Sequence, residues 1–165
     1  MANVNSTWIA NVVAVPTVAT NEAASAGRLK EAVGVATVSA TQASGDTIRL
    51  TRVPSNARIS DVVLCTADAT TAGAINIGIW RTAADGGAVV DADLFASALD
   101  LSGGPFNNTD VTFESGEYTY AEMEKPLWEV LGLTSDPSVV YDVVAQVSTT
   151  FNGGGTTMGL KVRYV

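Results

Sequence analysis

Residues 156–165 read TTMGLKVRYV, and apolar side chains stand at alternate positions from Met158 onward. An alternation with a period of two places apolar side chains on one face of a β-strand and polar or small ones on the other. Residues 139–147, VVYDVVAQV, show the same alternation, and the glycine-rich segment Asn152 to Gly155 separates the two stretches. The sequence therefore predicts two half-buried strands joined by a loop.

Further strands are predicted upstream by the same period. They are expected at residues 32–38, 47–51, 57–65 and 75–79. Turn signals at Ser44 to Asp46, Pro54 to Asn56 and Asp85 to Gly87 separate or follow them. We predict that residues 47–51 and 57–65 form a hairpin. Seven or eight strands spaced by turns indicate an all-β protein, specifically a jelly-roll-like β-sandwich.

The middle of the chain is less regular. Residues 88–101 predict a short strand followed by a short helix, and residues 111–114 predict an edge strand. Pro126 suits the first turn of a helix and Gly132 suits its C-terminal cap. One short helix is therefore expected at residues 126–131, and the side chain of Trp128 is expected to lie in the hydrophobic core of the protein.

Residues 1–27 are predicted to form an extended arm that precedes a sandwich domain at residues 28–165. Pro16 interrupts any regular element there, and Glu22 is the arm's only charged residue apart from the chain end. One interpretation is a frayed terminus; the other is an arm that becomes ordered on another subunit. In the second interpretation, the residues that contact the other subunit are Trp8, Ile9, Val12, Val13 and Val15.

The composition excludes several classes of function. The chain has 165 residues, 9 basic against 17 acidic, and a net charge of −8, which disfavours nucleic acid as a partner. Histidine is absent and Cys65 is the only cysteine, so imidazole catalysis, histidine zinc sites and internal disulfides are excluded. No run approaches the roughly 18 apolar residues of a membrane span, and no basic region precedes the apolar residues 8–19. We expect no cofactor, no membrane partner and folding in a cytoplasm.

Two groups of carboxylates are candidates for chemistry. Asp85, Asp91 and Asp93 supply oxygens of the kind that calcium prefers, but their spacing does not match an EF-hand loop, and solvated turn acids explain them better. A second group surrounds Lys125 and consists of Glu122, Glu124 and Glu129. A pair of carboxylates can cleave a glycosidic bond, but acids near a helix start also fit the helix dipole. No nucleophile motif such as G-x-S-x-G occurs, so we do not expect an enzyme.

The predicted hairpin contains a third of the basic residues, namely Arg49, Arg52 and Arg58. They form either a solvated sheet face paired with local acids or a contact patch for an acidic partner surface. Cys65 ends an apolar strand and is expected to be a small core residue.

Short motifs follow one another in a fixed order over residues 30–165. They are SGDTI (44–48), VPSNARI (53–59), GAINIG (73–78), DADLF (91–95), PLWEVLGL (126–133) with Asp136-Pro137, Tyr141-Asp142, and GLKVRYV (159–165). This series resembles small structural proteins encoded among the head genes of tailed bacteriophages, some of which are capsid decoration or cement proteins. The arm has no counterpart in that pattern.

The resemblance implies a β-sandwich that forms a homotrimer at threefold positions of an icosahedral shell and bridges neighbouring major capsid subunits. The expected location is then the outer capsid surface of the virion, after synthesis in the host cytoplasm. A rival reading is a carbohydrate- or receptor-binding module of a head fibre or tail, in which Trp80 or Trp128 stacks on a sugar ring.

Overall fold

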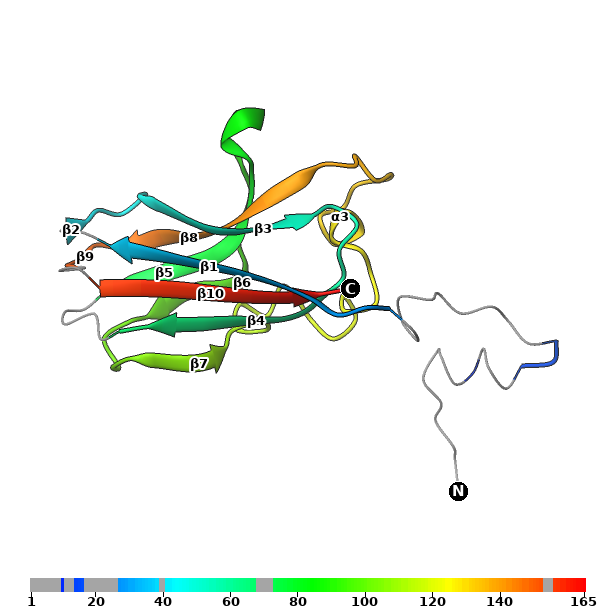
Figure 1. Ribbon diagram of the computed structural model, residues 1–165, viewed down its shortest axis with the longest axis horizontal. Helices are drawn as coiled ribbons and strands as arrows, with labels where there is room; N and C mark the ends of the chain where they lie inside the picture. The colour runs from blue at the N-terminus through cyan, green and yellow to red at the C-terminus, as the bar shows by residue number, and fades with distance from the viewer. Residues whose placement is uncertain (1–9, 11–13, 17–26, 39–40, 68–72, 153–155) are drawn as a thin grey trace, which may run out of the picture.

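Two four-stranded antiparallel sheets lie face to face (Figure 1). The computed structural model describes residues 10, 14–16, 27–38, 41–67, 73–152 and 156–165. The first sheet has the order β1 (Lys30–Val38), β10 (Thr156–Tyr164), β4 (Ile59–Thr66) and β7 (Phe106–Asp110). The second has the order β3 (Thr47–Pro54), β8 (Val140–Thr149), β5 (Ala74–Arg81) and β6 (Val89–Asp100). A small ribbon of β2 (Thr41–Gln42) and β9 (Phe151–Asn152) lies at one end.

The eight long strands pair in a nested order. Strand β1 pairs with β10, β3 with β8, β4 with β7, and β5 with β6. Such nesting is typical of sandwiches wound as jelly rolls. The described residues contain one α-helix, α3 (Leu127–Val130), and one 3-10 helix, η1 (Ala83–Asp85). The predicted all-β sandwich with one short helix is confirmed.

The core lies between the inner faces of the two sheets. Ile75, Ile77 and Ile79 of β5 are fully buried, as their alternation predicts. The inner face of the first sheet supplies Val62, Leu64, Met158, Leu160 and Val162. The alternation predicted for the last strand therefore assigns its apolar face correctly.

At one side of the sandwich, edge strand β1 of the first sheet lies directly on edge strand β3 of the second. Gly34 is the point of contact, and a Cβ atom at this position would overlap the backbone carbonyl of Leu50. Only a residue without a side chain permits this approach. The outward neighbours Val33 and Val35 remain 60% and 67% exposed.

The connection between β7 and β8 packs against the sandwich through Tyr118. This side chain is buried, and its hydroxyl donates a hydrogen bond to the carbonyl of Ile59 at 2.7 Å. Its ring meets Phe95 edge to face and stacks on Phe113. Burial raises the pKa of Tyr118 well above its usual value. The backbone of residues 115 and 118 also donates to carbonyls of β6, which protects the open edge of that strand.

Helix α3 ends as its sequence predicts, although Pro126 is the N-cap rather than the first helical residue. Gly132 has a φ of 73° and donates to the carbonyl of Glu129, while Leu133 donates to that of Trp128. These two bonds form a Schellman cap. The core residue of the helix is Leu127, which is 1% exposed. The expectation that Trp128 is a core residue is wrong, because this side chain is only partly buried.

Three other sequence predictions are also wrong. Residues 89–100 form strand β6 throughout, because irregular pairing with β5 shifts the apolar side chains between faces and imitates a helical spacing. Residues 111–114 form no strand; the polar segment Phe106–Asp110 pairs with β4 instead. Strands β3 and β4 form no hairpin, because the turn at 55–58 carries the chain from one sheet to the other.

The division into an arm and a sandwich domain stays a prediction. Most of residues 1–27 lie outside the described residues, including Trp8, Ile9, Val12 and Val13.

We expect Gly34→Ala to lower the free energy of unfolding by about 3 kcal/mol, because the added methyl group overlaps a backbone carbonyl that cannot move independently. Gly159→Ala is the matched control, since its Cβ would stand 3.6 Å from Val35 in ordinary contact. Urea denaturation measures both variants. Equal stability of the two would contradict the close approach of β1 to β3.

We expect Leu127→Ala to cost about 2–5 kcal/mol of stability, the usual range for a buried leucine. Trp128→Ala removes a larger side chain but should cost less, because Trp128 is only partly buried. The same denaturation measurement compares them. A larger loss for Trp128→Ala would place the tryptophan, not the leucine, in the core.

Candidate contact surfaces

Two of the three predicted contact arginines lie on β3 and bind the buried carboxylate of Asp142 on β8. Arg49 Nη1 donates to Oδ2 at 2.7 Å, and Arg52 Nε donates to Oδ1 at 2.6 Å. The Asp142 side chain is 3% exposed. Arg49 also donates to the carbonyls of Arg81 and Gly87, at 2.9 and 3.0 Å. Arg49 is therefore occupied by intramolecular acceptors, whereas the Arg52 side chain remains 62% exposed.

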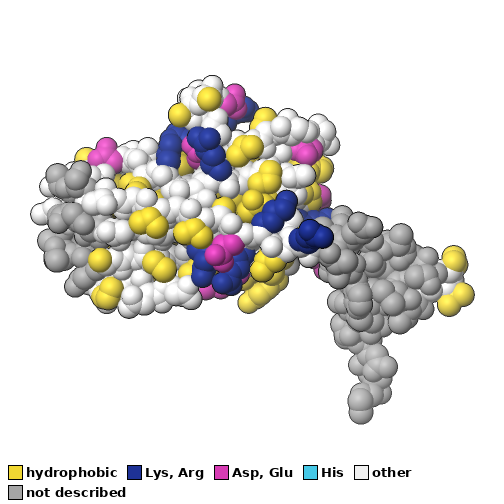
Figure 2. Space-filling view, viewed as in Figure 1, with side chains coloured by type: hydrophobic (Ala, Val, Ile, Leu, Met, Phe, Trp, Pro, Cys, Tyr) yellow, Lys and Arg dark blue, Asp and Glu magenta, His cyan; other side chains and the backbone are white. Residues whose placement is uncertain are grey.

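Arg58 lies apart from this pair. It precedes β4 in the first sheet, and its backbone exchanges two hydrogen bonds with Val165. Arg49 and Arg58 therefore do not lie on adjacent strands. Figure 2 shows lysine and arginine side chains beside acidic ones, without a continuous basic field on this face.

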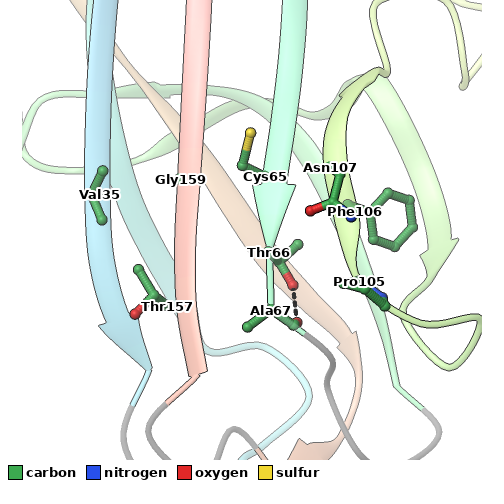
Figure 3. Close-up of a pocket in the computed structure, with 9 residues that line it drawn as sticks. All are labelled: Val35, Cys65, Thr66, Ala67, Pro105, Phe106, Asn107, Thr157 and Gly159. Atoms are coloured by element: carbon green, nitrogen blue, oxygen red, sulfur yellow. Dashed lines mark hydrogen bonds between the residues drawn. The ribbon is translucent and has the colours of Figure 1, made fainter.

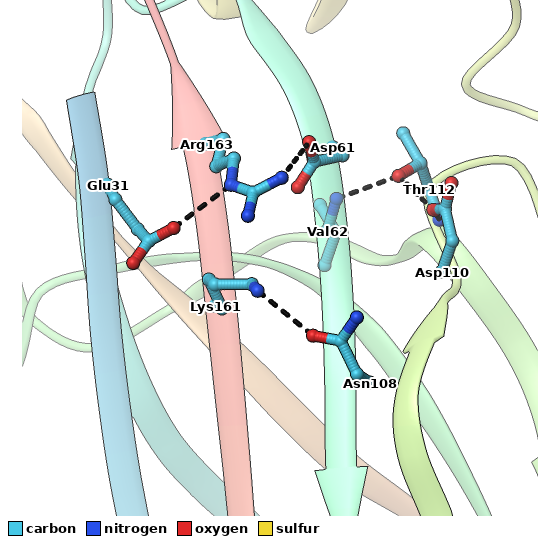
Figure 4. Close-up of polar contacts among 8 residues, drawn as sticks. All are labelled: Glu31, Asp61, Val62, Asn108, Asp110, Thr112, Lys161 and Arg163. Atoms are coloured by element: carbon cyan, nitrogen blue, oxygen red, sulfur yellow. Dashed lines mark hydrogen bonds and ion pairs between the residues drawn. The ribbon is translucent and has the colours of Figure 1, made fainter. Parts of the chain in front are cut away.

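The outer face of the first sheet carries ion pairs toward one end (Figure 4). Arg163 of β10 binds Glu31 of β1 at 2.9 Å and Asp61 of β4 at 3.4 Å. The hydrogen bond with Glu31 is the largest cause of the raised pKa of Arg163. One row further along, Lys161 donates to Asn108 at 2.9 Å. These contacts tie all four strands together on their outward side.

A groove of about 370 Å³ opens on the same face, beyond the ion pairs (Figure 3). Gly159 of β10 lies between Val35 of β1 and Cys65 of β4, its partners in the register. Pro105, Phe106 and Thr157 also line the groove, and none of its described lining residues is charged. Cys65 is exposed, so the expectation that it is a core residue is wrong: Leu64 takes the inner face and leaves Cys65 outward. The groove depends on the missing side chain at position 159, which sequence reasoning did not single out.

A cluster of carboxylates forms where β6 meets the loop that follows β7. Oxygens of Asp91, Asp93 and Glu117 lie within 4.8 Å of one another, a spacing that could hold a metal ion. Burial raises the pKa of Asp91, and the charges of Asp91 and then Asp93 raise the pKa of Glu117. The cluster excludes Asp85, which pairs with Arg81 at 2.8 Å. Asp91 accepts a hydrogen bond from the backbone of Asp93, and Asp93 accepts one from the Ser97 hydroxyl. The expectation that these two residues are solvated turn acids is wrong, because both lie in strand β6 and are partly buried.

The second carboxylate group holds its own loop in place. Glu122 accepts hydrogen bonds from the backbone and hydroxyl groups of Thr119 and pairs with Lys125 at 3.4 Å. The Thr119 hydroxyl is the main reason that the pKa of Glu122 is lowered. A general acid needs the opposite shift, since it must carry a proton near neutral pH.

The aromatic residues proposed to stack on a sugar are poorly placed for that role. Trp80 is 3% exposed and cannot present a ring face. Trp128 is partly buried. Among the described aromatic residues, Tyr120 is the most accessible: it is 78% exposed, and its ring centroid lies 4.7 Å from that of Phe113.

Comparisons with known proteins give one distant likeness. No protein-family model matches the chain, and no curated protein matches it. Among solved structures, a chain of the "Cyanophage Pam1 capsid asymmetric unit" is similar over 83% of this chain and 84% of its own, with a TM-score of 0.40 and 15% identity. At these values the likeness carries no inference about function. In the described part of the chain, no helix has the length and hydropathy needed to cross a membrane.

We expect Arg49→Glu to lower the free energy of unfolding by about 3–5 kcal/mol, because it places two carboxylates together where one is buried. Arg58→Glu is the control and should leave stability almost unchanged, since this residue lies outside the Asp142 cluster. Urea denaturation at pH 7 measures both variants. A tolerated Arg49→Glu would show that Asp142 does not depend on its partner.

Proposed function

We propose that the chain is a decoration or cement protein of a tailed-phage head. It binds the outer capsid surface, stabilises contacts between major capsid subunits and associates with itself as a homotrimer. The observation that supports this proposal is the ordered series of motifs over residues 30–165, which resembles head structural proteins.

Those motifs coincide with elements that build the sandwich. Residues 73–78 enter β5, residues 126–133 form α3 and its cap, and residues 159–165 include most of β10. Gly132 takes the positive φ that the cap requires. The resemblance thus concerns residues that determine the fold, which supports a shared architecture more than a shared surface.

The charge of the molecule agrees with an external position on a shell. A net charge of −8 repels packaged nucleic acid, so the protein does not compete for the genome. The strongest basic cluster, Arg49 and Arg52, is partly neutralised by Asp142. Arg58 and the exposed part of Arg52 are left as the proposed contacts to an acidic capsid surface. The proposal includes no catalytic step, cofactor or metal.

A carbohydrate- or receptor-binding module of a virion appendage is the second candidate. The observation that favours it is the exposed ring of Tyr120, which packs against the ring of Phe113. Exposed aromatic rings of this kind provide apolar contact area with a polar group at the edge. Labelling of the protein in virions and a glycan-binding screen distinguish the two functions.

We expect removal of residues 1–27 to leave the sandwich folded but to lower its occupancy on undecorated heads at limiting concentration. Trp8→Ala in the full chain should reproduce part of the loss, because Trp8 is the largest apolar residue of the arm. Glu22→Gln is the matched control and should bind like the unmodified chain. Full occupancy by the shortened protein would assign attachment to the sandwich alone.

A further inference from the structure

We propose that the groove around Gly159 receives the apolar N-terminal segment of a second copy of this chain, so that copies associate head to tail. This inference specifies how copies of the chain associate. It rests on the self-association in the proposed function and on no other part of that proposal. It does not require a capsid.

The groove has the shape and chemistry of a site for an extended apolar segment. Its floor is the backbone of β10 at Gly159, and its sides come from the neighbouring strands at Val35 and Cys65 (Figure 3). Val35 on edge strand β1 is 67% exposed, so its side chain is accessible to a partner. A partner that covers it would remove apolar surface from water.

The ion pairs that the structure describes on this face lie in one region. Arg163 pairs with both Glu31 and Asp61, which leaves one negative charge in excess, and Lys161 is held by Asn108 (Figure 4). Over the described part of the face nearer β2 and β9, Figure 2 shows scattered hydrophobic side chains, with an acidic side chain at the upper edge. The described lining residues offer a charged peptide no ion pair, so an uncharged, apolar occupant fits them best.

Residues 1–27 meet that requirement. Their apolar residues include Trp8, Ile9, Val12, Val13 and Val15, and Glu22 is the only charged side chain. Val15 is 98% exposed, so its own chain leaves it uncovered. At about 3.3 Å per extended residue, such a segment spans up to roughly 90 Å, enough to reach a neighbour.

The direction of β1 favours a neighbour's groove over the chain's own. The strand runs from Lys30 at the ion-paired end toward Val35 at the groove, so the segment joins the sandwich at the end away from the groove. Two copies of net charge −8 repel each other, and an apolar segment in a groove without described charges adds no like-charge contact to that repulsion.

Segment and groove are different surfaces, so the contact is heterologous. Such contacts close into a ring when the rotation between copies permits. Ordering a segment of this length offsets much of the gain from apolar burial, which makes a single exchange weak. Closure of a ring links several exchanges and raises the effective concentration of each segment at its groove.

The test uses the single native cysteine, which lies in the groove. Trp8→Cys, Val12→Cys and Val15→Cys are introduced one at a time into the full chain, and each purified variant is oxidised with copper phenanthroline and mapped by mass spectrometry. We expect at least one variant to form disulfides between the new cysteine and Cys65 of another copy. Covalent dimers and trimers should then appear on non-reducing gels. The links between the introduced cysteine and position 65 should be lost when Cys65→Ser is added to the same variant.

Three crosslinking outcomes would overturn the inference. They are an internal disulfide within a monomer, links only between two segments, and no link to Cys65 in any variant.

A second measurement blocks the groove without modifying the segment. Gly159→Val fills it from the floor, where a Cβ has only ordinary contacts. Gly103→Val adds the same side chain in open space and is the matched control. By sedimentation equilibrium without capsids, we expect the parent chain and Gly103→Val to be oligomers and Gly159→Val to be at least tenfold weaker in association, with an unchanged circular dichroism spectrum. A monomeric parent chain, or equal association of the two variants, would refute the inference. Intact oligomers that fail to bind heads would refute the proposed function alone.

Discussion

The position of β10 between β1 and β4 is the constraint on which the rest of the structure depends. Lys30 pairs with Tyr164, so the first strand of the sandwich cannot join its sheet until the last one is present. The inner face of β10 supplies Met158, Leu160 and Val162 to the core. Its outer face supplies Arg163 to the ion pairs and Gly159 to the groove. Because successive side chains point to opposite faces, a slip of one residue would exchange the two sets.

The sequence predicted the strands whose inner face carries apolar side chains at alternate positions. In β10 burial also alternates, whereas the central strands β5 and β8 are buried on both faces around Ile79 and Val143. Strand β6 was missed because its pairing with β5 is irregular, and Ala98 takes a φ of 51° within it. Strand β7 was missed because Phe106–Asp110 is almost entirely polar and exposed. Such an edge strand is defined by its neighbour β4 rather than by its own pattern.

The candidate surfaces were harder to predict than the fold. The partners Arg49 and Asp142 stand 93 residues apart, and nothing local in the sequence indicates that a carboxylate on β8 takes up two arginines of β3. The outward direction of Cys65 depends on the irregular start of β4, where Ile59 and Val62 both point inward. Glycine at 159 carries no signal of its own in the sequence, because its missing side chain becomes the floor of a groove only between the two strands that flank it.

Several charged side chains hold the fold together. Asp142 holds two arginines, Arg163 joins three strands, and Glu122 holds a loop. Groups used in this way are not free to bind a partner, which leaves the exposed apolar side chains as one source of contacts with other molecules. Apolar contacts over a small area are weak alone and gain strength by repetition. Such repetition arises when a protein attaches to a periodic surface or when its copies associate with one another. The apolar N-terminal segment and the groove around Gly159 suit association between copies.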